Sequence, residues 1–180
     1  SHPPLAACMA RLAAQASPDS DEPRQVVWDP FCGSGLELIE RSILGGVLTV
    51  HGTDLDPAAI GIARANFEAA GLENVSGMFT SCDFRDAEQL AGIAPGSITL
   101  VITNPPLGRR IRVKDMRGLI ADFFLAAAKA LEPEGLLIFT NPLRDGPTSP
   151  LLKLEYRQTV DLGGFDCQLE VYSKLVARGE

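Results

Sequence analysis

Residues 29–35, DPFCGSG, put an acid, a proline and two glycines directly after the apolar run at residues 26–28. Glycine weakens strands and helices alike, so two glycines this close together indicate backbone that bends sharply or approaches a ligand. Residues 36–44 are helix-like, so the stretch is typical of a loop between a buried strand and a helix. The start of that helix offers free N–H groups, which makes the loop a candidate ligand-binding element.

The loop does not match the common phosphate-binding motifs. It lacks the GxGxxG pattern of a dinucleotide fingerprint, and no Lys followed by Ser or Thr completes a phosphate loop. Asp29 lies within it and would repel a pyrophosphate. The acid suits a ligand that carries an ammonium group.

Strand-like and helix-like segments alternate along most of the chain. We predict helices over residues 4–15, 36–44, 56–70 and 116–131. We predict strands over residues 26–29, 47–55, 76–82, 97–103 and 136–140, and two more that turn at glycines 163 and 164 within residues 159–176. This order predicts an α/β fold, a mostly parallel sheet with helices on both faces and an antiparallel hairpin at one edge.

The composition fits one domain over residues 1–180. Hydrophobic residues make up 46% and charged residues 22%, no apolar run is long enough for a membrane, and no signal peptide opens the chain. Ser1 is not an initiator methionine, so we expect a processed or tagged chain or part of a longer protein. The four cysteines form no CxxC pair, which favours reduced thiols in a cytoplasmic protein over a zinc site or a disulfide framework.

Acids stand at the ends of three successive predicted strands: Asp29, then Asp54 in GTDLDP, then Asp83 in SCDF. For any one of them alone, a helix cap or a solvated loop residue is the plainer interpretation. Together they line the carboxyl edge of a parallel sheet, where ligands bind. Asp54 can take both hydroxyls of a ribose, and Asp83 can accept from an adenine amine with Phe84 against the ring. A ligand with an ammonium group, a ribose and an adenine is S-adenosylmethionine.

The fourth predicted strand ends in TNPPLG, residues 103–108. Asn104 would lie beside the sulfonium methyl group. Two prolines in succession make a stiff turn, because each fixes φ and lacks an N–H donor. The carbonyls of Asn104 and Pro105 then point outward, where they can hold both hydrogens of a planar exocyclic amine and turn its lone pair toward the methyl group. We therefore expect catalysis by alignment, without a general base.

A basic segment, GRRIRVKDMR at residues 108–117, follows directly. Its five basic residues are Arg109, Arg110, Arg112, Lys114 and Arg117. They belong either to a solvated loop or to a loop that contacts the phosphates beside a flipped base. Because the chain carries a net charge of −7, we expect weak, salt-sensitive binding of RNA by this domain alone.

Taken together, these stretches resemble a known family. DPFCGSGLELIE, GTDLDPAAI and TNPPLGRR, with the leading HPPLAACMARLA, are similar to the catalytic domain of the THUMP-associated, UPF0020-type RNA methyltransferases over nearly the whole chain. The resemblance implies a Rossmann-like class I fold with seven strands and S-adenosylmethionine as the cofactor. It also implies methylation of guanine N2 in tRNA or rRNA, and no metal.

The resemblance assigns site residues by position. Those implied to bind the cofactor are Asp29, Phe31, Cys32, Gly33, Gly35, Asp54, Leu55, Asp83, Phe84 and Asn104. Those implied to hold the target amine are Asn104, Pro105 and Pro106, and Leu107 is the fourth position of this catalytic motif. From the basic segment, we expect Arg109, Arg110 and Arg112 to contact the substrate.

Two departures from the family pattern keep other functions open. Leu107 stands where the family usually has a Tyr or Phe that stacks on the flipped base, and these residues contain no THUMP domain. The Asn-Pro-Pro motif is shared with adenine-N6 DNA methyltransferases and with glutamine methyltransferases of release factors, so DNA adenine and a protein glutamine are alternative targets. A non-catalytic module that binds the cofactor and positions a partner is a third alternative, against which the intact Asn104-Pro105-Pro106 turn argues.

Overall fold

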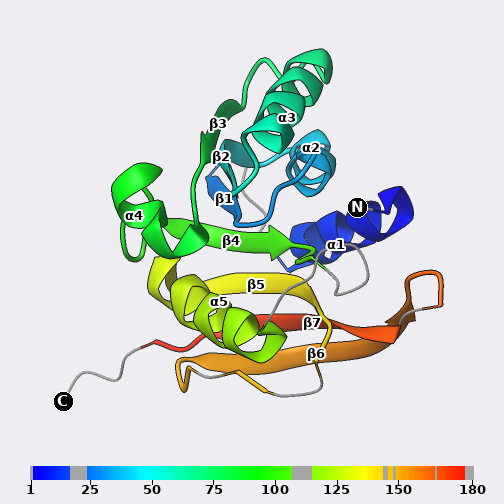
Figure 1. The fold of residues 1–180 in the computed structure, drawn as a ribbon, viewed down its shortest axis with the longest axis vertical. Helices are drawn as coiled ribbons and strands as arrows, with labels where there is room; N and C mark the ends of the chain where they lie inside the picture. The colour runs from blue at the N-terminus through cyan, green and yellow to red at the C-terminus, as the bar shows by residue number, and fades with distance from the viewer. Residues whose placement is uncertain are drawn as a thin grey trace.

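The computed structural model describes residues 2–16, 24–106, 115–143, 146–147, 149–164 and 166–176. These ranges contain a seven-stranded sheet in the order β3-β2-β1-β4-β5-β7-β6 (Figure 1). The strands are β1 Gln25–Asp29, β2 Val47–Asp54, β3 Ser76–Ser81, β4 Ile98–Thr103, β5 Leu131–Asn141, β6 Leu152–Asp161 and β7 Asp166–Lys174. The helices are α1 Pro3–Gln15, α2 Leu36–Ile43, α3 Pro57–Ala69, the 3₁₀ turn η1 Phe84–Asp86, α4 Ala87–Leu90 and α5 Met116–Ala130.

The pairing of the strands confirms the predicted architecture. Strands β1 to β5 pair in parallel, whereas β7 runs antiparallel to both β5 and β6. Parallel neighbours need a crossover connection, and the helices between the strands supply it. The hairpin of β6 and β7 closes the sheet at the edge opposite β3.

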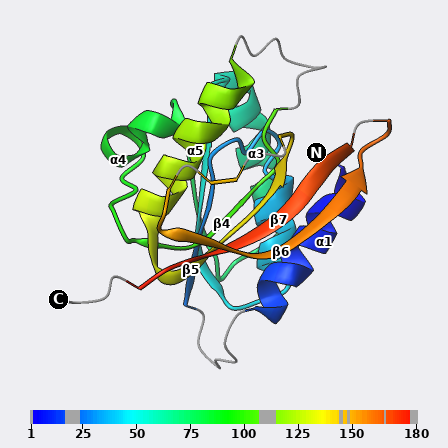
Figure 2. The same cartoon turned by 90° about the horizontal axis from the view of Figure 1, so that it is seen from below.

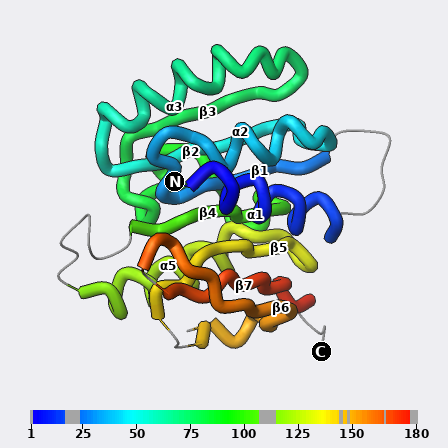
Figure 3. The backbone as a smooth tube through the Cα atoms, turned by 90° about the vertical axis from the view of Figure 1, so that its right-hand side faces the viewer, coloured from blue at the N-terminus to red at the C-terminus, as the bar shows by residue number. Residues whose placement is uncertain are grey.

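Helices cover both faces of the sheet (Figure 2). Helices α1, α2 and α3 pack on one face of the sheet, and α4 and α5 pack on the other. Strand β4 shows how one strand serves both layers, because Leu100 and Ile102 join the α1 side while Val101 joins the α5 side. The leading helix α1 lies beside α2 and across β4 and β5 (Figure 3). None of the helices in the described ranges is both long and apolar enough to cross a bilayer.

Local sequence signals explain where α3 begins. Asp56 caps the helix by accepting a hydrogen bond from the Ala58 N–H at 2.9 Å, and Pro57 occupies the first turn. This start agrees with the prediction.

The sequence did not predict three details of the fold. Strand β6 begins at Leu152 and not near residue 159, β5 begins directly after α5 at Leu131, and η1 and α4 were not foreseen. Strand β6 is an edge strand whose side chains are exposed at nearly every position, so it shows no alternation between apolar and polar residues.

Gly52→Ala tests the packing of β2, and Gly61→Ala in α3 is the matched control. A Cβ added at Gly52 would lie 2.6 Å from Phe79 Cδ1 and 3.0 Å from Cys32 Sγ. We expect Gly52→Ala to lower the free energy of unfolding by about 1–3 kcal/mol, because ring and thiol must both move. Gly61 in α3 has nothing within 4 Å of an added Cβ, and Gly61→Ala should raise stability by about 0.5–1 kcal/mol.

Urea unfolding followed by circular dichroism measures both changes. A neutral Gly52→Ala variant would contradict the close packing of the glycine loop on β2.

Candidate active site

The loop after β1 lies at the carboxyl end of the sheet and is tied to β2. The N–H of Cys32 donates to the carbonyl of Thr53 at 2.9 Å, and the N–H of Gly33 donates to Asp54 Oδ2 at 3.0 Å. Gly35 is the N-cap residue before α2 and has φ at 80°, and a Cβ there would lie 3.3 Å from the Cβ of Ala63. The glycine is therefore needed both for the turn and for the close approach of α3.

Asp29 is fully buried at the end of β1, with 0% exposure. Its Oδ1 accepts from the Phe31 N–H at 3.1 Å and from the Thr103 hydroxyl at 2.5 Å. Its Oδ2 is buried and has no hydrogen-bond partner among the described residues. Burial, followed by the nearby charge of Glu37, raises the pKa of Asp29 well above its usual range. A buried acceptor without a donor fits the ammonium group of the expected cofactor.

Asp54 and Leu55 lie at the tip of β2. Besides the bond from Gly33, Asp54 accepts through Oδ1 from the Asp56 N–H at 3.0 Å. A carboxylate has about four acceptor positions, so Asp54 can still receive the hydroxyls of a ribose. Leu55 leaves 71% of its surface exposed next to it. The ribose contact stays a prediction that this geometry allows.

Asp83 and Phe84 have structural roles in this arrangement. Asp83 caps η1 through the Arg85 N–H at 2.9 Å and forms an ion pair with the Arg85 guanidinium, also at 2.9 Å. Phe84 is 5% exposed and lies 5.1 Å from the ring of Phe31, while the guanidinium of Arg85 covers its ring at 4.7 Å. Arg85 also reaches Asp122 of α5 at 2.8 Å. The predicted contacts of Asp83 and Phe84 with adenine stay predictions.

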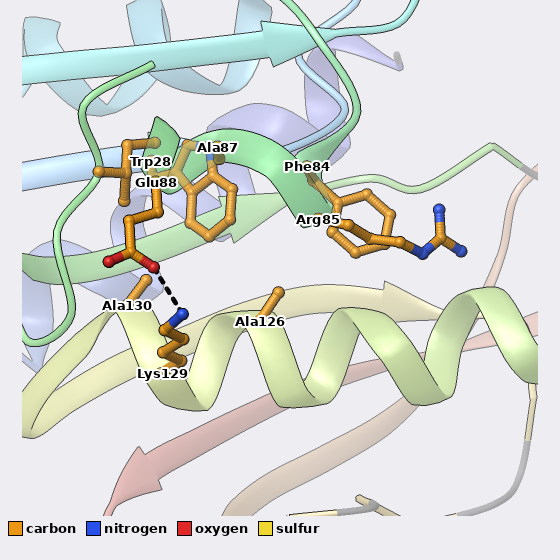
Figure 4. Close-up of a pocket in the computed structure, with 9 residues that line it drawn as sticks. Trp28, Phe84, Arg85, Ala87, Glu88, Ala126, Lys129 and Ala130 are labelled. Atoms are coloured by element: carbon orange, nitrogen blue, oxygen red, sulfur yellow. Dashed lines mark hydrogen bonds and ion pairs between the residues drawn. The ribbon is translucent and has the colours of Figure 1, made fainter. Parts of the chain in front are cut away.

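A small pocket lies beside η1 and α4, against α5 (Figure 4). Trp28 and Phe84 contribute apolar walls, and the ion pair of Lys129 with Glu88, 2.5 Å long, lies at its side. Its volume of about 60 Å³ is far below the roughly 300–1,000 Å³ of ligand pockets. This pocket is therefore too small for a nucleoside.

Asn104 follows β4 and is half-buried, and Pro105 behind it is buried. Asn104 Oδ1 accepts a hydrogen bond from the Thr140 hydroxyl at 2.5 Å. Because Asn104 directly follows Thr103, the predicted acceptor for the target amine is next in sequence to the donor that holds Asp29. The predicted residues Leu107, Arg109, Arg110 and Arg112 lie outside the described residues.

Sequence reasoning missed the two threonines that hold these side chains. Thr103 and Thr140 are fully buried and stand at the ends of the neighbouring parallel strands β4 and β5. The signal for them is a repeated Thr-Asn-Pro, found at residues 103–105 and again at 140–142. The repeat places a hydroxyl and an amide at each of two adjacent strand ends.

A family model described as UPF0020, RMKL-like, methyltransferase domain, matches residues 2–148. The ribosomal protein L11 methyltransferase of Caldanaerobacter subterraneus subsp. tengcongensis is 42% identical over 65 residues, which are 36% of this chain and 21% of that protein. The rRNA N(6)-adenosine-methyltransferase Mettl5 of Drosophila melanogaster is 36% identical over 119 residues, which are 65% of this chain and 52% of that protein.

The crystal structure of TrmN from Thermus thermophilus superimposes with a TM-score of 0.75 at 30% identity. The superposition covers 96% of this chain and 49% of that one. The chain thus spans about half of the length of TrmN and Mettl5, and a smaller share of the L11 methyltransferase.

Asp29→Asn tests the buried carboxylate. Because the folded-state pKa of Asp29 is raised, the native state holds a proton that the unfolded state releases above about pH 4, and stability falls as pH rises through this window. The variant should therefore melt a few degrees (roughly 2–4 °C) higher than wild type at neutral pH, with a flatter dependence on pH. It should also bind S-adenosylmethionine about 10-fold or more weakly, since a charge-assisted bond is lost.

Thermal unfolding across a pH series and calorimetry measure the two effects. Asp166→Asn, at an exposed position in β7, is the control for loss of one carboxylate. Unchanged cofactor affinity in Asp29→Asn would remove the acid from the binding site.

Proposed function

The chain belongs to the UPF0020 family of RMKL-like methyltransferase domains, and from this we propose that it methylates an exocyclic amine of an RNA base, with guanine N2 as the first target. S-adenosylmethionine supplies the methyl group when it is bound. The observation that carries the proposal is the Asn104-Pro105 turn, placed one residue after the threonine that holds Asp29. The buried acid with an unpaired oxygen and the Asn-Pro turn thus lie at one edge of the sheet, which supports the proposal.

The chain's own residues act by holding and aligning. Asp29 offers a buried, unpaired oxygen to a cation, which keeps the methyl donor in one position. The acceptors at Asn104 and Pro105 take the two hydrogens of the target amine, so that the nitrogen lone pair faces the donor. Alignment of this kind lowers the barrier without a base, because the nitrogen loses its proton only after the new bond has formed.

The choice of an RNA base rests on the motif resemblance and on the relatives. Mettl5 is named as an rRNA N(6)-adenosine-methyltransferase, which makes adenine N6 the second base to test. The L11 methyltransferase is named for a ribosomal protein, which supports a protein glutamine as the alternative outside nucleic acid. All three targets present a planar NH₂ group with two hydrogens to the same two acceptors.

We propose that part of the RNA-binding affinity comes from outside these 180 residues. The net charge of −7 opposes a polyanion, and the chain covers 49% of TrmN and 52% of Mettl5. The basic segment after the Asn-Pro-Pro turn would supply local phosphate contacts, and an additional domain or partner would supply the rest.

We also place the enzyme in the cytoplasm as part of this proposal. All four cysteines are free thiols in the structure, and three of them are buried. A chain with unpaired cysteines suits a reducing compartment.

Nucleoside mass spectrometry tests the function directly. RNA from cells without the gene should lack one N2-methylguanosine that returns when the gene is restored. Loss of N6-methyladenosine instead would move the target to adenine, and loss of methylation only on protein would overturn the RNA assignment.

Asn104→Ala should separate catalysis from cofactor binding. We expect kcat to fall by about 100-fold or more, because one of the two acceptors for the amine is gone. The affinity for S-adenosylmethionine should change by less than about threefold, since Asp29 and Asp54 are intact. Steady-state kinetics on the unmethylated RNA substrate measures kcat, and calorimetry measures the affinity for the cofactor. Near-normal turnover would exclude Asn104 from the mechanism.

Arg109→Glu with Arg110→Glu tests the basic segment. The double reversal should weaken RNA binding and reduce its slope with log salt by about 2, because two phosphate contacts are lost. Cofactor affinity should be unchanged. Filter binding at several salt concentrations measures the slope, and an unchanged slope would leave the segment a solvated loop.

A further inference from the structure

Thr140 has a contact that the proposed function does not yet use. It is fully buried at the end of β5, and its hydroxyl donates to Asn104 Oδ1 at 2.5 Å. No other acceptor for this hydroxyl is found in the part of the chain that the structure describes. The hydroxyl hydrogen is therefore satisfied only when the oxygen of the Asn104 amide faces β5.

The orientation of this amide matters because its two ends are chemically opposite. A primary amide has nearly the same shape when it is turned by 180°, but the turn exchanges an acceptor oxygen for an NH₂ with two donors. An NH₂ group aimed at the target amine would set N–H against N–H. An oxygen that spends one lone pair on Thr140 keeps the second for a hydrogen of the amine.

We propose that Thr140 is a positioning residue for methyl transfer, whose hydroxyl holds the Asn104 amide with its oxygen available as the amine acceptor. This inference rests on the proposed function, since it assigns Asn104 Oδ1 to the target amine. Thr140 acts only through Asn104 and does not itself contact the substrate. If the hydroxyl of Thr140 is replaced by an apolar group, that group bonds neither end of the Asn104 amide. The amide can then turn its NH₂ group toward the target amine.

The neighbouring strand supplies an internal comparison. Thr103 ends β4 as Thr140 ends β5, and its hydroxyl donates to Asp29. The two threonines thus serve the two halves of the site, one through the acid for the cofactor and the other through the amide for the amine. Loss of each hydroxyl should affect a different kinetic parameter.

The experiment compares Thr140→Val, which replaces the hydroxyl by a methyl group of similar size, with Thr140→Ser, which keeps the hydroxyl. We expect kcat on the unmethylated RNA substrate to fall about 10-fold or more in Thr140→Val, and to stay within about threefold of wild type in Thr140→Ser. The affinity for S-adenosylmethionine should be unchanged in both. Thr103→Val should show the reverse, with weaker cofactor binding as its main defect.

Thr99→Val controls for the loss of a threonine hydroxyl in the sheet. Thr99 Oγ1 bonds the N–H and the carbonyl of Val26, both at 3.0 Å, and it lies near the start of β4, away from the site. This variant should lose stability without a specific loss of kcat. Circular dichroism checks folding, and if Thr140→Val does not fold, the same comparison is made between Thr140→Ala and Thr140→Ser.

Each outcome separates this inference from the proposed function. Wild-type kcat in Thr140→Val, with Asn104→Ala inactive, overturns the positioning role and keeps the proposed function. Equal loss of kcat in Thr140→Val and Thr140→Ser assigns the effect to packing, and a defect confined to cofactor affinity assigns it to the other half of the site; both overturn the inference. An active Asn104→Ala variant overturns the proposed function itself.

Discussion

A carboxylate with no exposed surface stands at the end of β1, and the candidate site is arranged around it. Removing the charge of Asp29 from water costs several kcal/mol even after relaxation, and two hydrogen bonds to one oxygen return only part of that cost. The bend at Phe31 and the threonine at the end of β4 are both needed to supply these bonds. On the proposed function, the remaining oxygen would accept from the ammonium group of the cofactor, so that binding and folding would be coupled at one atom.

Side-chain hydrogen bonds continue this arrangement across the carboxyl end of the sheet. The links between strands are Asp29–Thr103, Asn104–Thr140, Asn141–Glu170 and Glu170–Arg157. Glu170 is fully buried and also accepts from the Tyr172 hydroxyl at 2.9 Å, and burial together with that carboxylate raises the pKa of Tyr172, which keeps the phenol a donor. Glu170 has no exposed surface while the Arg157 side chain is 38% exposed, so removal of Arg157 would leave a buried carboxylate with one donor fewer. The strand ends are thus held to one another by more than backbone pairing, which suits a site that works by alignment and loses rate with small displacements.

The sequence predicted those parts of the fold and site that depend on local signals. The cap and the proline at Asp56-Pro57 mark the start of α3 through contacts within the helix. The glycines of the first loop indicate a turn independently of tertiary contacts. Strand β6 was recognised only from residue 159, because an exposed edge strand is formed by pairing with β7 and leaves no apolar pattern. Thr140 was missed for a related reason. A threonine at a strand end is common, and the repeat of Thr-Asn-Pro at residues 140–142 marks the position without giving its partner. Asn104 is 36 positions away, so the three-dimensional register brings hydroxyl and amide together.

The distribution of charge shows how such a domain can act on a polyanion. Acids end β1 and β2, and Asp83 follows β3 by two residues, so negative charge gathers where a cation is expected. The basic segment at residues 108–117 follows the Asn-Pro-Pro turn, where contacts with phosphates are expected. With 23 acidic and 16 basic residues, the domain gains little from long-range attraction of RNA. On the proposed function, a neighbouring domain or partner binds the RNA and compensates for the low RNA affinity of this domain. Tethering raises the local concentration of the target base at the site. Weak contacts then favour release of the methylated product, and the binding energy within the domain is left for the alignment of one amine.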